Sequence, residues 1–198
     1  MQAFGDMIMS KKNSAKFGLI IGIMCLILTG CGGKSGDGEM STSNYADMMS
    51  GFDVRRFDVT SDDLHDGVWD TIITNTEYGE NVSPSLSWDP VEGAGSYVIY
   101  MVDPTARNWM HWKSNDVNDT DLEQGWASDD EYVGPYPPSG THDYEIYVIA
   151  VKEGLDTIGG DFDAANIGFE DVLKALNVPA GNILAYGHIV GTYTHGDR

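Results

Sequence analysis

The chain has 198 residues and a formal net charge of −20, and 41% of its residues are hydrophobic. This length suits one ordinary domain with a tail or a targeting segment, and the composition excludes a disordered or low-complexity chain. The acidic balance repels nucleic-acid phosphates, so we exclude nucleic acid as a partner. With two cysteines, Cys25 and Cys31, the sequence contains neither a disulfide framework nor a cysteine-built zinc site.

The first thirty residues have the pattern of a bacterial lipoprotein signal peptide. Three lysines between residues 11 and 16 precede an uncharged apolar run at 17–28, which is shorter than the ~20 residues that span a bilayer comfortably. The run ends in Leu28-Thr29-Gly30-Cys31, which resembles the lipobox, where the cysteine is lipidated and becomes the first mature residue. We therefore expect residues 1–30 to be removed and Cys31 to carry the lipid; the alternative is an uncleaved anchor helix.

Residues 31–52 are rich in glycine and serine and show no apolar period, so we expect a flexible tether followed by one domain at residues 53–198. Lipid-anchored through Cys31, this domain would lie on the extracytoplasmic face of a cell membrane. Cleavage would remove the three lysines, so acyl chains rather than basic residues would hold the protein to the membrane.

The remainder of the chain is predicted to be mainly β. Apolar residues alternate with polar ones at 57–60 and 86–88. A continuous apolar run typical of a buried strand follows at 97–102, residues 144–151 repeat that pattern, and residues 186–193 give a last strand. One segment has helical spacing, with Phe169, Val172, Leu173 and Leu176 on one face and Pro179 shortly after it. These elements indicate a mainly antiparallel β fold with little helix.

Three segments place histidine, aspartate and tight-turn residues beside the predicted strand ends. Asp103 follows the buried run at 97–102, and His111 comes soon after it, so the carboxylate can orient an imidazole across a loop. A stretch rich in proline and glycine at 134–140 then leads to His142 and Tyr144. Proline restricts φ, so this loop is expected to be stiff and to position the two side chains at the start of the next strand.

These segments resemble the phosphatidylethanolamine-binding proteins, also called Raf kinase inhibitor-like proteins, and their order and spacing agree with the bacterial branch. The resemblance covers about residues 53–195. The matching motifs are Gly79-x-Asn81-x-Ser83-Pro84-x-Leu86-x-Trp88, Tyr97 through Asp103-Pro104-x-Ala106, His111-Trp112, Tyr132-x-Gly134-Pro135-x-Pro137-Pro138-x-Gly140-x-His142-x-Tyr144 and Gly191-Thr192-Tyr193.

The resemblance implies a phosphatidylethanolamine-binding-protein-like β-sandwich with a central antiparallel sheet and one or two short helices. It also implies a small surface pocket for an anionic ligand or a phospholipid head group, without a cofactor or a metal. Imidazole and backbone N–H groups and a phenol are suitable donors to phosphoryl oxygens. Carried over by position, the pocket residues are Asp103, Ala106, His111, Gly134, Tyr136, Pro137, His142 and Tyr144.

Two positions depart from the family pattern. Asp143 stands where the family usually has arginine, so we expect weaker affinity for anions. Tyr136 stands where a small residue or cysteine is common, so it would narrow the pocket or add a hydroxyl donor. Both departures bear on which ligand is chosen.

Other functions are weighed against this one. The acidic residues at 116–123 suggest calcium, but an EF-hand loop begun at Asp119 would have Gln124 where glycine is required. The sequence has no Gly-x-Ser-x-Gly or His-Glu-x-x-His motif, so we do not expect an enzyme. The alternative function is an inhibitor or scaffold that acts on a partner protein such as a protease or kinase. His188 and His195 have no motif context and are interpreted as structural.

Overall fold

The computed structural model of this chain describes residues 45–198. The predicted signal peptide, the lipidated Cys31 and most of the predicted tether lie outside the described residues. Within residues 45–198, no helix is long and apolar enough to cross a membrane.

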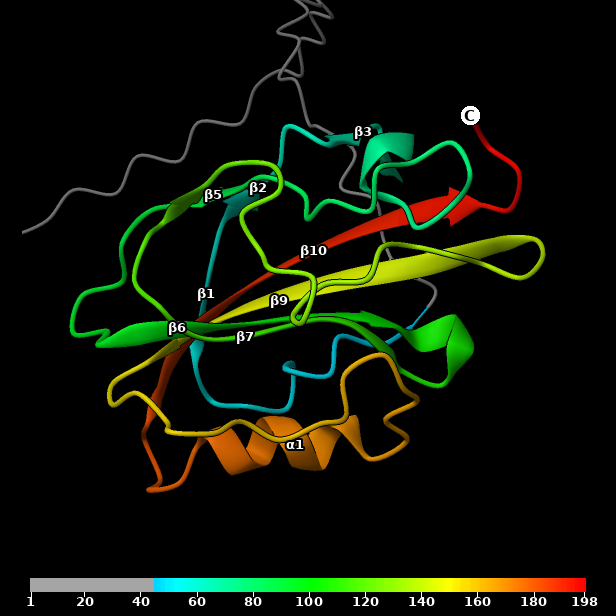
Figure 1. Ribbon diagram of the computed structural model, residues 1–198. Helices are drawn as coiled ribbons and strands as arrows, with labels where there is room; N and C mark the ends of the chain where they lie inside the picture. Colours follow the sequence, from blue (N-terminus) through cyan, green and yellow to red (C-terminus); the bar gives the residue numbers. More distant parts are fainter. Residues whose placement is uncertain (1–44) are drawn as a thin grey trace, which may run out of the picture. The chain divides into compact units, whose positions relative to one another are not determined.

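The described residues form two sheets and one α-helix (Figure 1). A seven-stranded sheet has the order β3-β4-β10-β9-β6-β7, with β1 also paired to β10, and a three-stranded sheet has the order β2-β5-β8. Pairing is antiparallel except where β1 and β4 meet β10. The elements are β1 (Arg55–Phe57), β2 (Val59–Thr60), β3 (Leu64–His65), β4 (Val68–Trp69), η1 (Thr71–Ile73), β5 (Leu86–Trp88), β6 (Ser96–Asp103), η2 (Pro104–Ala106), β7 (Trp109–Val117), β8 (Asp121–Leu122), β9 (Thr141–Val151), α1 (Phe169–Leu176) and β10 (Ile183–Thr194).

The three long apolar runs form the centre of the large sheet, as predicted. Strands β6, β9 and β10 are adjacent, and almost every residue of β6 and β9 is buried. A strand buried on both faces needs apolar residues at consecutive positions rather than at every second one. The mainly β fold with a central antiparallel sheet is therefore confirmed.

Two cores lie on the two faces of the large sheet. Successive side chains of a strand point to opposite faces, so Ile99 and Tyr144 belong to the core under the small sheet, whereas Tyr100 and Tyr147 belong to the core under α1. Figure 1 shows the small sheet and α1 on opposite sides of β6, β9 and β10. Anything built on one face of these strands is thus separated from the other face by the sheet itself.

Helix α1 lies where the sequence predicts a helix, and it packs through the predicted residues. Phe169, Leu173 and Leu176 are buried, and Val172 packs partly buried beside them. An apolar stripe at this spacing lies along one face of a helix, and this face packs on the sheet.

The structure differs from the sequence prediction at the small elements. The predicted strand at 57–60 is divided at Asp58, because β1 pairs with β10 of the large sheet while β2 pairs with β5 of the small one. Strands β3, β4 and β8 have two residues each, too few to show an apolar period. Such short strands exist because tertiary neighbours supply their hydrogen bonds.

The domain also begins earlier than the predicted boundary at residue 53. Met49 is fully buried in the core under α1, and Met48 and Phe52 pack partly buried against that core. Three apolar residues among glycine and serine are too few to produce a visible period, so their packing was not predictable from the local pattern. The end of the predicted tether is therefore part of the folded domain.

Candidate ligand-binding site

The predicted site residues with titratable side chains meet at one end of the large sheet. Asp103 ends β6, His111 lies near the start of β7, and His142 and Tyr144 lie at the start of β9. Antiparallel pairing places the end of β6 beside the starts of both of its neighbours. The four side chains are all buried.

Asp103 makes two bonds through its two carboxylate oxygens. Oδ1 accepts the backbone N–H of Ala106 at 2.9 Å, which caps helix η2, and Oδ2 accepts Nδ1–H of His142 at 2.6 Å. Asp103 is 2% exposed and His142 is 9% exposed. The carboxylate therefore fixes the ring of His142 with Nδ1 turned inward, and Nε2 is the nitrogen left for another partner. Ala106 takes part through its N–H, which is used inside the protein.

His111 reaches the same place because of a β-bulge. Met101 pairs with Trp112 and Val102 pairs with Met110, so His111 is an extra residue on β7. A bulge re-aims the side chain that it contains. The ring of His111 packs edge-on against Tyr144 at 5.2 Å, and the ring of His142 stacks on Tyr144 at 6.4 Å. Tyr144 thus lies in contact with both imidazoles.

The hydrogen bonds and the burial define the proton positions at neutral pH. Nδ1 of His111 lies 2.8 Å from the carbonyl oxygen of Val133, which can only accept, so Nδ1 carries the proton. Burial lowers the pKa of His111, although the Val133 carbonyl and the charge of Asp103 oppose this effect. His111 is therefore neutral at pH 7, with the lone pair on Nε2.

The hydroxyl of Tyr144 is a buried donor. Burial raises the pKa of Tyr144 above its usual range, and the charge of Asp103 adds to this, whereas the nearby backbone N–H of Tyr136 acts in the opposite direction. The hydroxyl has no hydrogen bond of standard geometry to any residue in 45–198. A buried hydroxyl without such a bond is uncommon in native proteins, which makes Tyr144 a candidate donor to a ligand.

We expect the neutral state of His111 to make stability depend on pH. With its pKa lowered on folding, the folded protein binds fewer protons than the unfolded chain near and below pH ~6.5. The free energy of unfolding should therefore fall as the pH drops through this range, by at most about 1.4 kcal/mol per pH unit. Urea unfolding between about pH 7.5 and 5.5 measures this slope. His111→Gln should have a shallower slope, and an unchanged slope would contradict the assignment.

The loop before β9 is held by bonds that use its backbone. The N–H of Gly134 donates to Oδ1 of Asn81 at 2.7 Å, and the carbonyl of Pro137 accepts Nδ1–H of His195 at 2.9 Å. Gly134 and Pro137 are buried, whereas Tyr136 is 64% exposed. These predicted site residues thus shape the loop, while the side chain of Tyr136 extends into solvent.

Sequence reasoning missed three residues that support the site. Asn81 belongs to a motif that the family resemblance already contains, so its role could have been found there. His195 has no motif context, and its bond to Pro137 joins parts of the chain that are 58 residues apart. The carbonyl of Val133 has no signal in the sequence, because any residue has a carbonyl.

Asp143 lies on the other side of β9 from His142 and Tyr144. Alternation along the strand directs its side chain to the face that carries Tyr147 and α1, where Asp143 is buried. Its backbone N–H donates to Oγ1 of Thr105 at 3.1 Å. The expected loss of anion affinity would therefore have to act across the sheet rather than by direct contact, and it stays a prediction, as does the effect of Tyr136.

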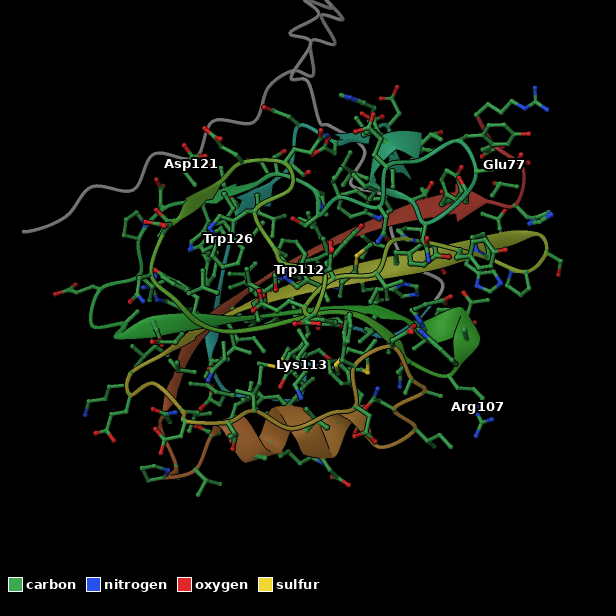
Figure 2. All side chains as sticks on the ribbon, in the orientation of Figure 1. Glu77, Arg107, Trp112, Lys113, Asp121 and Trp126 are labelled. Carbon is green, nitrogen blue, oxygen red and sulfur yellow. The ribbon has the colours of Figure 1, made fainter. Side chains whose placement is uncertain are left out.

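Side chains near the site show the same alternation (Figure 2). Trp112 and Lys113 project to opposite sides of β7, Trp112 into the core under the small sheet and Lys113 toward the carbonyl of Gly160. Arg107, after helix η2, extends away from the domain into solvent. Within the described part of the chain, no three His, Cys, Asp or Glu side chains lie close enough together to hold a metal ion.

Two cavities lie elsewhere in the domain. One of about 360 Å³ lies between residues 46–52 and α1, and one of about 420 Å³ is lined by residues 160–168 and Val172. Neither is lined by a predicted site residue. The predicted site is therefore defined by its side-chain chemistry and not by a cavity.

Comparison with known proteins gives matches over this same region. Residues 60–194 match the family model described as phosphatidylethanolamine-binding protein. A protein of Methanothermobacter thermautotrophicus described as UPF0098 is 34% identical over 139 residues, which cover 60% of this chain and 86% of that protein. A protein of Archaeoglobus fulgidus with the same description is 30% identical over 137 residues, but the match spans 59% of this chain and only 44% of that protein's length.

Two solved structures share the fold. A homologue of the phosphatidylethanolamine-binding protein from Chlamydia trachomatis has a TM-score of 0.52 and 22% identity, and the match covers 70% of this chain and 97% of that one. YbcL of Escherichia coli, described as a member of the mammalian family, has a TM-score of 0.54 and 24% identity, with coverages of 70% and 98%. At these identities the likeness concerns the fold.

Proposed function

The chain belongs to the phosphatidylethanolamine-binding protein family, and we propose that it binds the anionic part of a small ligand, a phosphate or a phospholipid head group. The observation that carries the proposal is the meeting of two buried imidazoles and a buried phenol at one sheet end. Each imidazole bonds to the protein through Nδ1, and the phenol hydroxyl has no hydrogen bond of standard geometry within the described residues. The site consists of Asp103, His111, His142 and Tyr144, which we call the imidazole site.

The hydrogen bonds within the imidazole site suit recognition of a phosphoryl group. The Tyr144 hydroxyl donates, and each Nε2 either accepts from a protonated phosphoryl oxygen or donates once the ring is protonated. Asp103 balances the charge of His142 in its protonated form. Both oxygens of Asp103 already accept hydrogen bonds, so we assign this carboxylate a holding role, and we propose binding rather than catalysis.

We further propose that a lipid on Cys31 tethers this domain to the extracytoplasmic face of a membrane. The support is the lysine-rich start, the apolar run and the Leu-Thr-Gly-Cys pattern of the sequence. Expressed in a bacterium, the full chain should partition into detergent, whereas Cys31→Ser should stay in the aqueous phase. Equal partitioning of the two would contradict the lipid anchor.

Isothermal titration tests the ligand. Phosphate, phosphoethanolamine and glycerophosphoethanolamine are titrated into residues 38–198, which include all the described residues. We expect saturable binding, weakened at least about 10-fold in His111→Ala and in His142→Ala, because each loses a charge-assisted bond worth about 1.5–3 kcal/mol. The order of affinities then distinguishes free phosphate from a lipid head group as the ligand.

The matched control is His65→Ala. His65 is exposed on β3, with its Nε2 3.3 Å from Asp70, and it belongs to no part of the imidazole site. Its removal should leave the affinity unchanged. Absence of binding by the folded wild-type domain would overturn the proposal and would favour action on a partner protein instead.

A further inference from the structure

A second cluster of polar side chains lies on the opposite face of β9 and β10. It faces α1 and the residues that lead into the domain, whereas the imidazole site faces the other way. Residues 45–54 cross this face, and Met49 within them is fully buried in the core under α1. We call residues 45–54 the leading segment. One carboxylate of this segment, that of Asp47, contacts the sheet.

The carboxylate of Asp47 lies among three donor groups of the sheet. Its Oδ2 accepts the hydroxyl of Tyr186 at 2.9 Å and lies 3.5 Å from Nη1 of Arg56 and 3.7 Å from Nδ1 of His188. Its Oδ1 accepts the backbone N–H of Met49 at 2.9 Å. Guanidinium, phenol and imidazole are the donors that recognise a carboxylate in proteins, and here they come from strands β1 and β10.

The donors are themselves held in place. The guanidinium of Arg56 lies over the ring of Tyr186 at 5.4 Å, and its Nη2 donates to the carbonyl of His188 at 3.3 Å. His188 stacks on Tyr147 at 4.4 Å with an interplanar angle of 12°. Burial raises the pKa of Tyr186 to about 12, and its hydrogen bond to Asp47 adds to this, so the hydroxyl is a donor at neutral pH.

A second carboxylate lies beneath the first. Glu145 is fully buried, its Oε2 accepts the hydroxyl of Tyr147 at 2.7 Å, and Nε2 of His188 lies 3.4 Å from the same oxygen. His188 therefore stands between two carboxylates, Asp47 and Glu145. Buried charges are tolerated only when they are paired, so the arrangement is a built site rather than a chance surface contact.

Asp47 is also reachable from outside. It lines the cavity of about 360 Å³ between the leading segment and α1, and its side chain is 17% exposed. The carboxylate of Asp47 is thus not sealed inside the protein.

We propose that Arg56, Tyr186 and His188 form a carboxylate-binding site and that Asp47 of the same chain is its resident ligand. Occupied by Asp47, the site holds the leading segment on the sheet. A free carboxylate can take the place of the Asp47 side chain, so this attachment is exchangeable. The site is separate from the imidazole site, and its ligand has a different chemistry.

Hydrogen exchange of the leading segment tests the attachment. The reporters are the amide of Met48, which donates to Oη of Tyr147 at 3.3 Å, and the amide of Phe52, which donates to the carbonyl of Met49 at 3.0 Å. In the full chain, Asp47→Ala should speed exchange at both amides at least about 10-fold. The matched control is Asp53→Ala, an exposed aspartate of the same segment, which should change neither amide.

The same measurement tests the donor side. Arg56→Gln should also speed exchange, but by less than Asp47→Ala, because Tyr186 and His188 still hold the carboxylate. The double variant should be no faster than Asp47→Ala alone, because Asp47→Ala already removes the contact with Arg56. Arg55→Gln is the matched control, since Arg55 is the exposed neighbour of Arg56 on β1. These surface changes leave the buried cores intact. A full chain in which Asp47→Ala exchanges no faster than Asp53→Ala would overturn the proposal.

Free acetate distinguishes a binding site from a fixed ion pair. In Asp47→Ala the three donors lack their resident carboxylate, so acetate at about 100 mM should raise the thermal unfolding temperature by mass action, whereas chloride at equal ionic strength should not. The rise should be smaller in the double variant with Arg56→Gln. An Asp47→Ala protein whose unfolding temperature responds equally to acetate and to chloride would overturn the binding site and leave a purely structural ion pair.

Discussion

Replacing Asp103 by alanine should lower the free energy of unfolding by about 3 kcal/mol and remove measurable ligand binding at the imidazole site. The buried carboxylate accepts both the N–H of Ala106 and Nδ1–H of His142. Its loss leaves two buried donors without partners and frees the ring of His142 to rotate. Urea unfolding and isothermal titration with phosphoethanolamine measure the two effects.

Asp103→Asn separates the charge of this side chain from its shape. The amide oxygen can still cap helix η2, so the stability loss should shrink to about 1–2 kcal/mol, while binding should still be impaired because His142 loses its charged partner. The control is Asp121→Ala, an exposed aspartate on β8 (Figure 2), which should stay within about 0.5 kcal/mol of wild type. An Asp103→Ala protein as stable as this control would show that the bond to His142 contributes nothing.

Gly134→Ala should have a comparable effect through the backbone. A Cβ atom at this position would lie 2.1 Å from the carbonyl oxygen of Ile73 and 2.7 Å from the backbone nitrogen of Asn75. Backbone atoms cannot move aside as a flexible side chain can, so the loop before β9 must shift. We expect a loss of about 3 kcal/mol in stability, together with weaker ligand binding as Tyr136 and Pro137 move. Thermal unfolding and titration report the two losses.

Gly51→Ala is the matched control for this substitution. A Cβ atom on Gly51 would meet nothing within 4 Å, so its stability should remain within about 0.5 kcal/mol of wild type. If Gly134→Ala unfolds at the same temperature as Gly51→Ala, the close approach of the loop to residues 73–75 is not a constraint on the fold.

Much of the fold was predictable from local patterns. The segments at 97–102 and 144–151 are strands with apolar residues at almost every position, whereas the strand at 186–193 mixes apolar residues with glycine and polar ones. All three lie at the centre of the large sheet. The helix at 169–176 follows from its apolar spacing in the same way. These signals are local, since each element carries its own period. The leading segment was missed because its apolar residues, among them Met48, Met49 and Phe52, show no such period.

The candidate site was predictable in membership but not in arrangement. The motifs single out Asp103, His111, His142 and Tyr144, and the family explains why those residue types occur together. No local pattern predicts the bulge that turns His111 toward Tyr144, because a bulge arises from the pairing of β6 with β7. Likewise, the carbonyl of Val133 becomes a partner of His111 only once residues 22 positions apart are brought together.

The sequence by itself therefore determined the class of fold, the central strands, the helix and the list of residues with useful chemistry. The tertiary structure alone decided which atoms of those residues form hydrogen bonds within the protein and which are available to a ligand. It also decided that Asp143 faces away from His142 and that Asp47 reaches Arg56, Tyr186 and His188. The physical reason is the separation along the sequence. A period is set by residues a few positions apart, whereas these contacts join side chains that only the paired strands bring together.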